Sequence, residues 1–356
     1  MKRFFECLIP VSVCNLKCPY CYIVQENRRD MQIAELKYSV ERIVSGLTKE
    51  RLGGQCWFSL CGAGETLVQD EIIDITDGLL NNGHFVNITT NGTLSNKIDL
   101  LLEKCQKNVK HLHLSFSLHY LELKRLNLLN AFFSNVKKAR QSGASILVQI
   151  NLCDDYISYI DEIKELCIKE VGACPQVALT RDESCVPMKI FSKLSDEEYF
   201  LKGEEFNSPL FRFTFKNFNV KRKEYCYAGD WSGVLNLATG VLQKCYANLD
   251  GAQDIFEDIN RPIRFEAVGK NCLNNYCVNS SHFMSLGVIP SIKTPSYADL
   301  RNRAEAKWYS DEMVAFLNRR LYADNRKYSF LKKLFLHNAF FRKVKIKLGL
   351  TFKKNK

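Results

Sequence analysis

The sequence lacks the features that mark membrane-spanning, secreted and disordered chains. No run of about 18 consecutive apolar residues occurs in the 356 residues, which excludes a membrane-spanning helix. The N-terminus lacks the charged, apolar and small-residue order of a signal peptide, and the acids Glu6 and Glu26 stand early. A composition of 46% hydrophobic and 25% charged residues excludes disordered and collagen-like classes. We therefore expect a cytoplasmic globular protein of about two domains.

Acidic residues are scarce in the C-terminal segment. Residues 318–356 hold thirteen lysines and arginines but one acid, whereas the rest of the chain holds 37 basic and 38 acidic residues. The net charge of +11 therefore comes from this segment, and we expect no nucleic-acid partner. Its apolar residues recur near helical spacing, at Leu331, Leu334, Phe335, Phe341 and Leu348. This pattern predicts a basic amphipathic helix that either packs on the body or lies at the inner face of an anionic membrane.

Short apolar runs alternate with helical patterns about every 30 residues over the first 200 residues. The predicted strands cover residues 4–9, 56–60, 85–89, 111–116, 146–150 and 176–179. The predicted helices cover residues 36–47, 71–80, 98–105, 129–140 and 159–168. This order predicts an α/β fold with a partial, TIM-like (β/α)6 barrel, and an open doubly wound sheet is the alternative.

The alternation stops after about residue 184. The aromatic stretch 211–220 alternates and predicts a strand or hairpin edge, and residues 234–242 predict two short strands around a turn. From residue 301 onward the pattern is helical. We therefore expect three parts: a barrel core at 1–210, a small α+β domain at 211–290 and a basic helical extension at 291–356.

Three cysteines follow the first predicted strand within eight residues, at Cys14, Cys18 and Cys21. In a reducing compartment, such thiols indicate a metal, a cluster or a catalytic site rather than disulfides. Iron–sulfur clusters usually take four cysteines, so three leave one iron open to another ligand. A zinc loop or three buried thiols are the alternatives.

The spacing Cys-x-x-x-Cys-x-aromatic-Cys, with Tyr20 in the aromatic position, resembles the motif of the radical S-adenosylmethionine (SAM) superfamily. The resemblance implies a 4Fe–4S cluster whose open iron binds SAM. It also implies that electron transfer cleaves SAM to methionine and a 5′-deoxyadenosyl radical, which takes hydrogen from a substrate. The segment 61–67 resembles the family's Gly-Gly-Glu-Pro segment, with Thr66 in place of proline. The cofactor-binding residues implied by the resemblance are Tyr20, Gly62, Gly64, Glu65, Asn91, Ser117 and Asn151.

A second set of cysteines lies at Cys226, Cys245, Cys272 and Cys277. The spacing Cys-x13-Gly-x4-Cys resembles the opening of SPASM and twitch extensions, which implies one fully ligated auxiliary 4Fe–4S cluster of the twitch type. A zinc site is the alternative. His282 is either a further ligand or a histidine that makes hydrogen bonds within a turn. The remaining eight cysteines are expected in the core, except that Cys185 follows the sixth strand on the catalytic face.

The resemblance implies an oxidoreductase that acts on a small molecule or carbohydrate. Thr180, Arg181 and Asp182 end the sixth strand and are candidates to grip a polar substrate, and Cys185 is a candidate to donate or accept a hydrogen atom. A low-potential donor such as flavodoxin or ferredoxin would supply electrons. A peptide-modifying enzyme is the first rival, although Cys14 leaves no room before it for a leader-binding domain. A non-catalytic electron-transfer protein is the second rival.

Overall fold

The computed structural model describes residues 1–337 apart from positions 30, 32, 34, 186, 247, 249, 271, 273, 275, 278 and 279. Six parallel strands lie side by side in chain order: β1 (Phe4–Ile9), β2 (Trp57–Gly62), β3 (Phe85–Thr90), β4 (Leu112–Ser117), β5 (Ser145–Leu152) and β6 (Gln176–Leu179). The strand order has no reversal, so a doubly wound sheet is excluded. The fold is mixed α/β with a large parallel sheet, as expected for a partial barrel.

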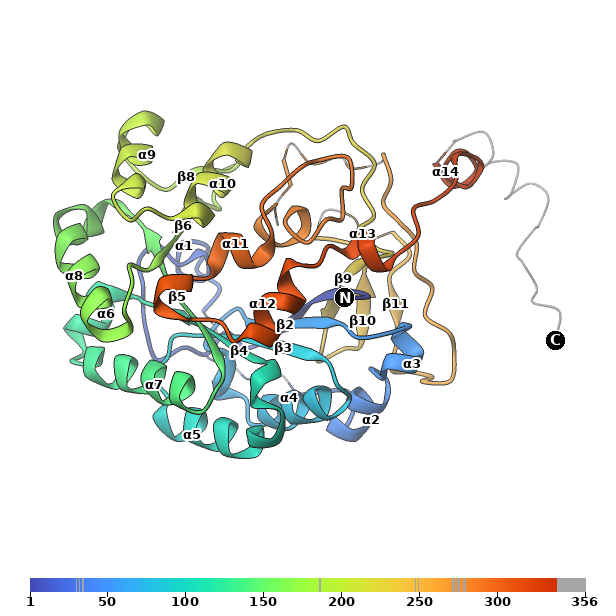
Figure 1. Ribbon diagram of the computed structural model, residues 1–356, viewed down its shortest axis with the longest axis horizontal. Coiled ribbons are helices and arrows are strands. Elements are labelled where there is room, and N and C mark those ends of the chain that lie inside the picture. The colour runs from blue at the N-terminus through green and yellow to red at the C-terminus, as the bar shows by residue number, and fades with distance from the viewer. Residues whose placement is uncertain are drawn as a thin grey trace.

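The helices that follow these strands form one layer along the sheet (Figure 1). They are α4 (Glu71–Asn81), α5 (Ser95–Lys104), α7 (Leu129–Gln141) and α8 (Ile160–Val171), and each contacts the next. These four predictions are confirmed to within a few residues. The first predicted helix, 36–47, is shorter than expected: α2 spans Val40–Ser45 because the Ser39 side chain caps it by accepting a hydrogen bond from Arg42 N (3.3 Å).

The predicted turn at 238–240 connects two strands, which confirms the hairpin. These strands, β9 (Ser232–Asn236) and β10 (Val241–Gln243), continue the barrel sheet: β9 pairs in parallel with β1, and β10 pairs antiparallel with β9. With β11 (Gln253–Asp254), the sheet has nine strands. The hairpin therefore extends the sheet from β1 through β9 to β10, and Cys245 follows β10.

The segment after residue 296 covers the amino ends of the barrel strands. It forms α11 (Tyr297–Arg301) and α12 (Asp311–Asn318). Tyr297 lies 5.8 Å from Trp57 at the start of β2, and Phe316 stacks at 3.8 Å on Phe85 at the start of β3, both measured between ring centroids. Because the amino ends are covered, the carboxyl ends remain for a site.

The predicted strand over residues 211–220 is wrong, because Pro209–Asn217 forms helix α10. Ser208 caps this helix by accepting from Phe211 N (3.2 Å), and Pro209 occupies its first turn. Phe211 and Phe215 lie four residues apart on one helix face, with ring centroids 5.9 Å apart. Before α10 runs a further helix, α9 (Asp196–Glu204), which begins with a capping box of Ser195 and Glu198.

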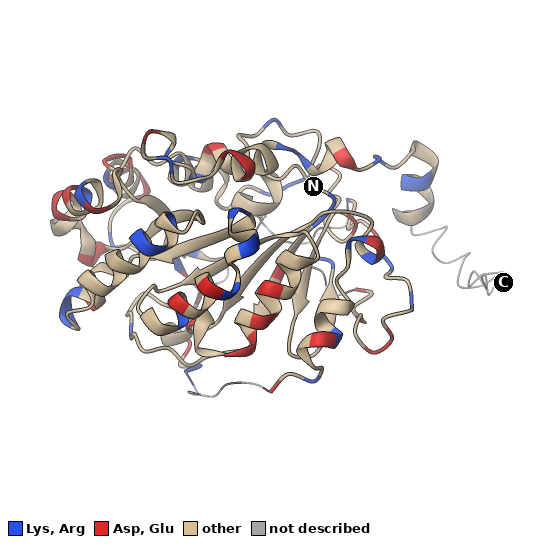
Figure 2. Ribbon diagram, turned by 60° about the horizontal axis from the view of Figure 1, so that its bottom comes forward, with Lys and Arg blue, Asp and Glu red and all other residues tan. Residues whose placement is uncertain are grey.

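Within the basic C-terminal segment, the described residues form two helices, α13 (Leu321–Asp324) and α14 (Phe330–His337). Figure 2 shows α14 at one end of the molecule, beyond the sheet. Phe330 and Leu331 are 78% and 63% exposed. The predicted apolar positions Phe341 and Leu348 lie outside the described residues. No helix among the described residues is long and apolar enough to span a membrane.

Candidate active site

The first cysteine loop lies at the carboxyl end of β1 and is fixed by its neighbours. Lys17 N donates a hydrogen bond to Glu122 Oε1 (2.8 Å) on α6 (Tyr120–Arg125). The loop also packs against Gly64, where an added Cβ would lie 2.1 Å from Val13 O. Gly64 is therefore required by close backbone approach, beside the position of Cys14.

Two thiols of this loop, Cys14 and Cys18, lose their protons less readily than a free thiol because they are buried. Burial raises the pKa of the Cys14 thiol and raises that of Cys18 to about 12. Leu16 N donates to Cys14 Sγ (3.4 Å), which favours the thiolate. A bound metal cluster would reverse the protonation of these thiols, because coordinating thiols are deprotonated. Three thiols on one fixed loop at the open end of the sheet fit a three-cysteine cluster.

The buried side chain of Tyr20 holds the first cysteine loop in place. Its hydroxyl is hydrogen-bonded to His119 Nδ1 (2.7 Å) and to Tyr156 OH (3.0 Å), and its ring is buried. Burial raises the pKa of Tyr20 well above its usual value, so this hydroxyl stays protonated. The aromatic position of the motif therefore anchors the cysteine loop to the ends of β4 and β5.

Glu65 ties the ends of β2 and β3 together. Its Oε1 accepts hydrogen bonds from Leu67 N (3.0 Å) and Thr90 Oγ1 (2.7 Å), and its Oε2 accepts from Asn91 N (2.7 Å). Glu65 is 2% exposed. Burial raises the pKa of its carboxyl group, and the three hydrogen bonds lower this pKa by a smaller amount. A carboxylate has about four acceptor positions, so about one remains on Oε2.

The other predicted SAM contacts lie at the same end of the sheet. Gly62 N donates to Thr66 Oγ1 (3.0 Å), which closes the turn at the position where the resembling motif has proline. Ser117 and Asn151 are half-buried near the ends of β4 and β5. Asn91 follows β3 and contacts the cysteine loop through its side chain.

A group of four ionisable side chains that sequence reasoning missed lies between the two cysteine sets. Cys61 Sγ donates to Glu6 Oε1 (3.3 Å). Burial raises the pKa of the Tyr22 and Tyr246 hydroxyls, and Cys61 raises both further. The negative charge of Glu6 also raises the pKa of Tyr246. Each tyrosine directly follows a predicted ligand, Cys21 or Cys245. A sequence signal existed: Glu6 is the one charged residue in the strand Phe-Phe-Glu-Cys-Leu-Ile.

The four cysteines of the second set line one cavity of about 560 Å³, part of it open to solvent: Cys226, Cys245, Cys272 and Cys277. Burial raises the pKa of Cys226 well above its usual value, and the three other thiols add to this. Among the residues that the structure describes, no three His, Cys, Asp or Glu side chains close on a single metal ion. Four thiols around one cavity are the ligand set of both a four-cysteine iron–sulfur cluster and a four-cysteine zinc site.

His282 faces the barrel rather than this cavity. Its Nδ1 lies 3.8 Å from Glu6 Oε2, and its ring stacks on Phe4 at 5.7 Å between ring centroids. Burial lowers the pKa of His282 well below its usual value, so the imidazole stays neutral.

Arg181 and Cys185 lie on a separate antiparallel hairpin, β7 (Arg181–Asp182) and β8 (Lys189–Ile190). The Arg181 guanidinium pairs with Glu183 Oε1 at 2.7 Å, and Cys185 Sγ donates to Asp182 Oδ2 at 3.2 Å. Burial raises the pKa of Tyr276, which lines the second cavity, whereas its contacts with Arg181 lower it. The hairpin therefore borders the cavity that the second cysteine set lines. Thr180 is buried at the end of β6.

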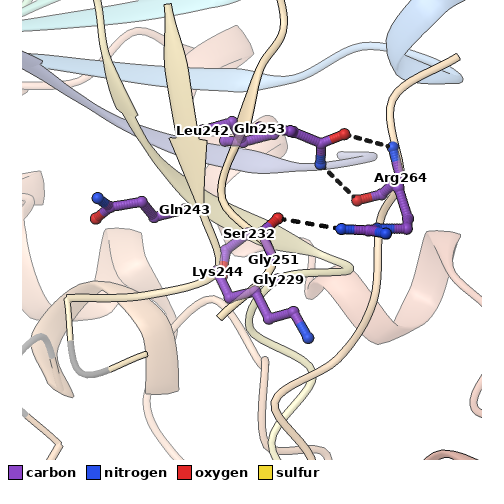
Figure 3. Close-up of a pocket in the computed structure, with 8 residues that line it drawn as sticks. All are labelled: Gly229, Ser232, Leu242, Gln243, Lys244, Gly251, Gln253 and Arg264. Carbon is purple, nitrogen blue, oxygen red and sulfur yellow. Dashed lines mark hydrogen bonds between the residues drawn. The ribbon is translucent and has the colours of Figure 1, made fainter. Parts of the chain in front are cut away.

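Most of the remaining cysteines are in the core, as predicted: Cys7, Cys56, Cys105, Cys153 and Cys167 are buried. Cys61, Cys174 and Cys185 are half-buried. Another pocket, of about 250 Å³, lies beside the hairpin β9–β10 (Figure 3). There Gln253 and Arg264 exchange two hydrogen bonds of 2.8 and 3.0 Å, and Lys244 Nζ pairs with Glu266 at 3.0 Å. These charged and polar groups bond to one another and form no catalytic cluster.

Comparison with known proteins agrees with this geometry. Residues 8–167 match the model of the Radical SAM superfamily. The fold is similar to Streptococcus suis SuiB bound to S-adenosylmethionine, with 18% identity over 72% of this chain and a TM-score of 0.53. The chain spans 64% of the length of that SuiB chain. SuiB bound to precursor peptide SuiA has 16% identity over 89% of this chain and 66% of that chain, with a TM-score of 0.49. Histidine-tagged anSMEcpe with bound AdoMet has 13% identity over 99% and 97% of the two chains, with a TM-score of 0.47. No curated protein sequence matches.

Proposed function

We propose that this chain, whose residues 8–167 match the model of the Radical SAM superfamily, cleaves SAM reductively and abstracts hydrogen from a substrate. The observation that supports this most directly is the fixed loop of Cys14, Cys18 and Cys21 at the open end of the sheet. Glu65 lies beside it with a free acceptor position. When bound there, a 4Fe–4S cluster supplies the electron that splits SAM into methionine and a 5′-deoxyadenosyl radical.

The chain's own residues bind and orient SAM. The Glu65 carboxylate accepts from the SAM ammonium group, and the Gly62–Gly64 turn lets the backbone approach the cofactor. Ser117 and Asn151 offer polar groups to the ribose from the ends of β4 and β5. Tyr20 holds the cysteine loop in place through its buried hydroxyl.

The second cysteine set would hold an auxiliary 4Fe–4S cluster, as in twitch extensions. The cavity that all four cysteines line supports this, and neither cysteine pair has the Cys-x-x-Cys spacing that zinc ribbons favour. The four ligands would be Cys226, Cys245, Cys272 and Cys277. This cluster would accept an electron from the substrate or order the substrate pocket.

The substrate would lie between the two cysteine sets, over Glu6 and Cys61. Carboxylate, thiol and tyrosine hydroxyl groups at this place favour a polar compound with hydroxyl groups, such as a small molecule or a carbohydrate. Arg181, on the hairpin that borders the second cavity, would bind the substrate from the side. The reaction would be an oxidation or a related modification, with electrons from a flavodoxin or ferredoxin.

A peptide is the second candidate substrate, and a non-catalytic electron-transfer protein is the third candidate function. SuiB has been crystallised with a precursor peptide. A precursor-peptide gene beside the gene of this chain would favour the peptide, whereas sugar- or polymer-building enzymes would favour a small molecule. Glu65, buried beside the cysteine loop with an acceptor position to spare, argues against a purely electron-carrying role.

Iron analysis tests the two proposed clusters. We expect about eight irons and eight sulfides per chain after anaerobic reconstitution. Alanine at Cys14, Cys18 and Cys21 together should leave about four irons, and Cys245→Ala should also lower the count. Cys174→Ala is the matched control, because Cys174 is half-buried outside both sets. About four irons and one zinc in the wild type would contradict the auxiliary cluster.

A further inference from the structure

The side chain of Asn91 joins the end of β3 to the first cysteine loop. Its Nδ2 group donates hydrogen bonds to Cys14 Sγ (3.7 Å) and Asn15 Oδ1 (2.8 Å). Its Oδ1 atom accepts from the backbone N (3.1 Å) and the Oγ1 (2.6 Å) of Thr93. The residue is 4% exposed. An asparagine amide offers two donor hydrogens and two acceptor lone pairs, so all four positions are committed within the protein.

The orientation of this amide follows from its partners. Exchanging its oxygen and nitrogen would turn Oδ1 toward Asn15 Oδ1 and the Cys14 sulfur, and the amino group toward the donors of Thr93. The amide therefore faces Cys14 with its N–H. The side chain thus directs its two donor hydrogens toward the cysteine loop.

The backbone of Asn91 connects the same residue to the proposed SAM contact. Asn91 N donates to Glu65 Oε2 at 2.7 Å. The carboxylate that would hold the SAM ammonium and the sulfur of a cluster ligand are thus linked through one residue. A substitution of the Asn91 side chain would remove the bond to Cys14 Sγ and keep the backbone bond to Glu65.

We propose that Asn91 is a positioning residue that raises the reduction potential of the three-cysteine cluster by donating a hydrogen bond to Cys14 Sγ. This rests on the proposed function, because it takes Cys14 as a cluster ligand. Reduction adds one electron from a low-potential donor, and no bond breaks in this step. A hydrogen bond to a ligand sulfur stabilises the added negative charge and so favours the reduced cluster.

The test is an anaerobic redox titration of the reconstituted protein, with dithionite as reductant, followed by electron paramagnetic resonance. In Asn91→Ala we expect the midpoint potential of the three-cysteine cluster to fall. In Asn91→Asp, which keeps the side-chain size but replaces the N–H donor by an oxygen, it should fall further. The auxiliary cluster in the same sample is the internal control and should keep its potential.

Asn135→Ala is the matched control. It loosens the turn after β3 without removing the hydrogen bond to Cys14. Asn135 Nδ2 donates to Gly92 O (2.9 Å) and Ser95 Oγ (2.9 Å), next to Asn91 but away from Cys14. This variant should keep the wild-type potential. Loss of iron in both Asn91 variants but not in Asn135→Ala would support the positioning role. An unchanged potential in Asn91→Ala with full iron, or an equal fall in Asn135→Ala, would overturn the proposal. Iron content and SAM cleavage of the wild type report separately on the proposed function.

Discussion

Cys61 Sγ donates a hydrogen bond to Glu6 Oε1 at 3.3 Å, although 55 residues separate the two in the chain. The pair lies on neighbouring strands β1 and β2, which run in parallel with Leu8 opposite Cys61. Two tyrosines lie close to Cys61: Tyr22, which follows Cys21 of the first cysteine set, and Tyr246, which follows Cys245 of the second. We expect a substrate to meet the SAM-derived radical beside this thiol.

We expect Cys61 to quench that radical when substrate is absent. With SAM and dithionite in D₂O, the wild type should form singly deuterated 5′-deoxyadenosine, because the exchanged S–D bond is weaker than the C–D bond that forms. Dithionite and solvent then restore the thiol with one electron and one deuteron. Mass spectrometry of the product should show most of this label lost in Cys61→Ala.

Cys7→Ala is the matched control for this experiment. Cys7 follows Glu6 on the same strand, so its side chain points to the opposite face of the sheet, where it is fully buried. Its replacement should leave the label unchanged. Equal labelling in Cys61→Ala and the wild type would remove Cys61 from the substrate site.

Replacement of Glu65 should weaken SAM binding. Glu65→Ala should keep both clusters but bind SAM about ten- to a hundredfold more weakly, because a charge-assisted hydrogen bond is lost from a buried site. Calorimetric titration of the anaerobic protein with SAM measures this. Thr90→Val is the control: it removes one donor to Glu65 Oε1 and lowers stability, yet it leaves the carboxylate in place. Equal SAM affinity in Glu65→Ala and the wild type would contradict the assignment.

His84 should make the protein less stable in acid. Burial lowers the pKa of His84 to about 4, and its neutral ring accepts from Cys56 N (3.1 Å) at Nδ1 and donates to Leu47 O (2.9 Å) from Nε2. The unfolded chain binds this proton near pH 6.5, so the contribution is complete above that pH and falls as the pH drops. Between about pH 7.5 and 5.5 the loss should be about 1 kcal/mol of unfolding free energy.

Denaturant unfolding at several pH values checks this. The difference in unfolding free energy between the wild type and His84→Gln should shrink as the pH falls from about 7.5 to about 5.5, since glutamine does not titrate. A constant difference between the two proteins over this range would show that His84 titrates alike in both states.

The C-terminal helix should attach the protein to anionic vesicles. Phe330, Leu331 and Leu334 are exposed on α14, and each nearby Lys or Arg would add about 1 kcal/mol of attraction at low salt. The full chain should float with such vesicles, and a truncation after Ser329 should not. This cut retains Tyr328, which packs on Tyr227 at 5.3 Å between ring centroids. If the full chain does not float with the vesicles at low salt, membrane binding is wrong, and the C-terminal helix packs on the rest of the protein instead.

The parallel sheet could be predicted from the sequence because each of its six strands is a short apolar run between helical patterns. The aromatic stretch could not: Phe211, Phe213 and Phe215 fit a strand period of two, whereas Phe211 and Phe215 also fit a helical spacing of four. The cap at Ser208 and Pro209 decided between them. The three cysteines of the first loop are predicted as cluster ligands from their spacing alone, and the structure places them on one loop after β1. The Glu6–Cys61 pair depends on the register between β1 and β2, which no local pattern encodes.

The formation of 5′-deoxyadenosine from SAM tests the central claim most directly. The anaerobically reconstituted wild type, given SAM and dithionite, should form this product slowly even without substrate. The variant with alanine at Cys14, Cys18 and Cys21 should form none, whereas Cys174→Ala should match the wild type. No 5′-deoxyadenosine from a wild type that holds about eight irons, or equal amounts from the triple variant, would contradict the proposed radical SAM chemistry.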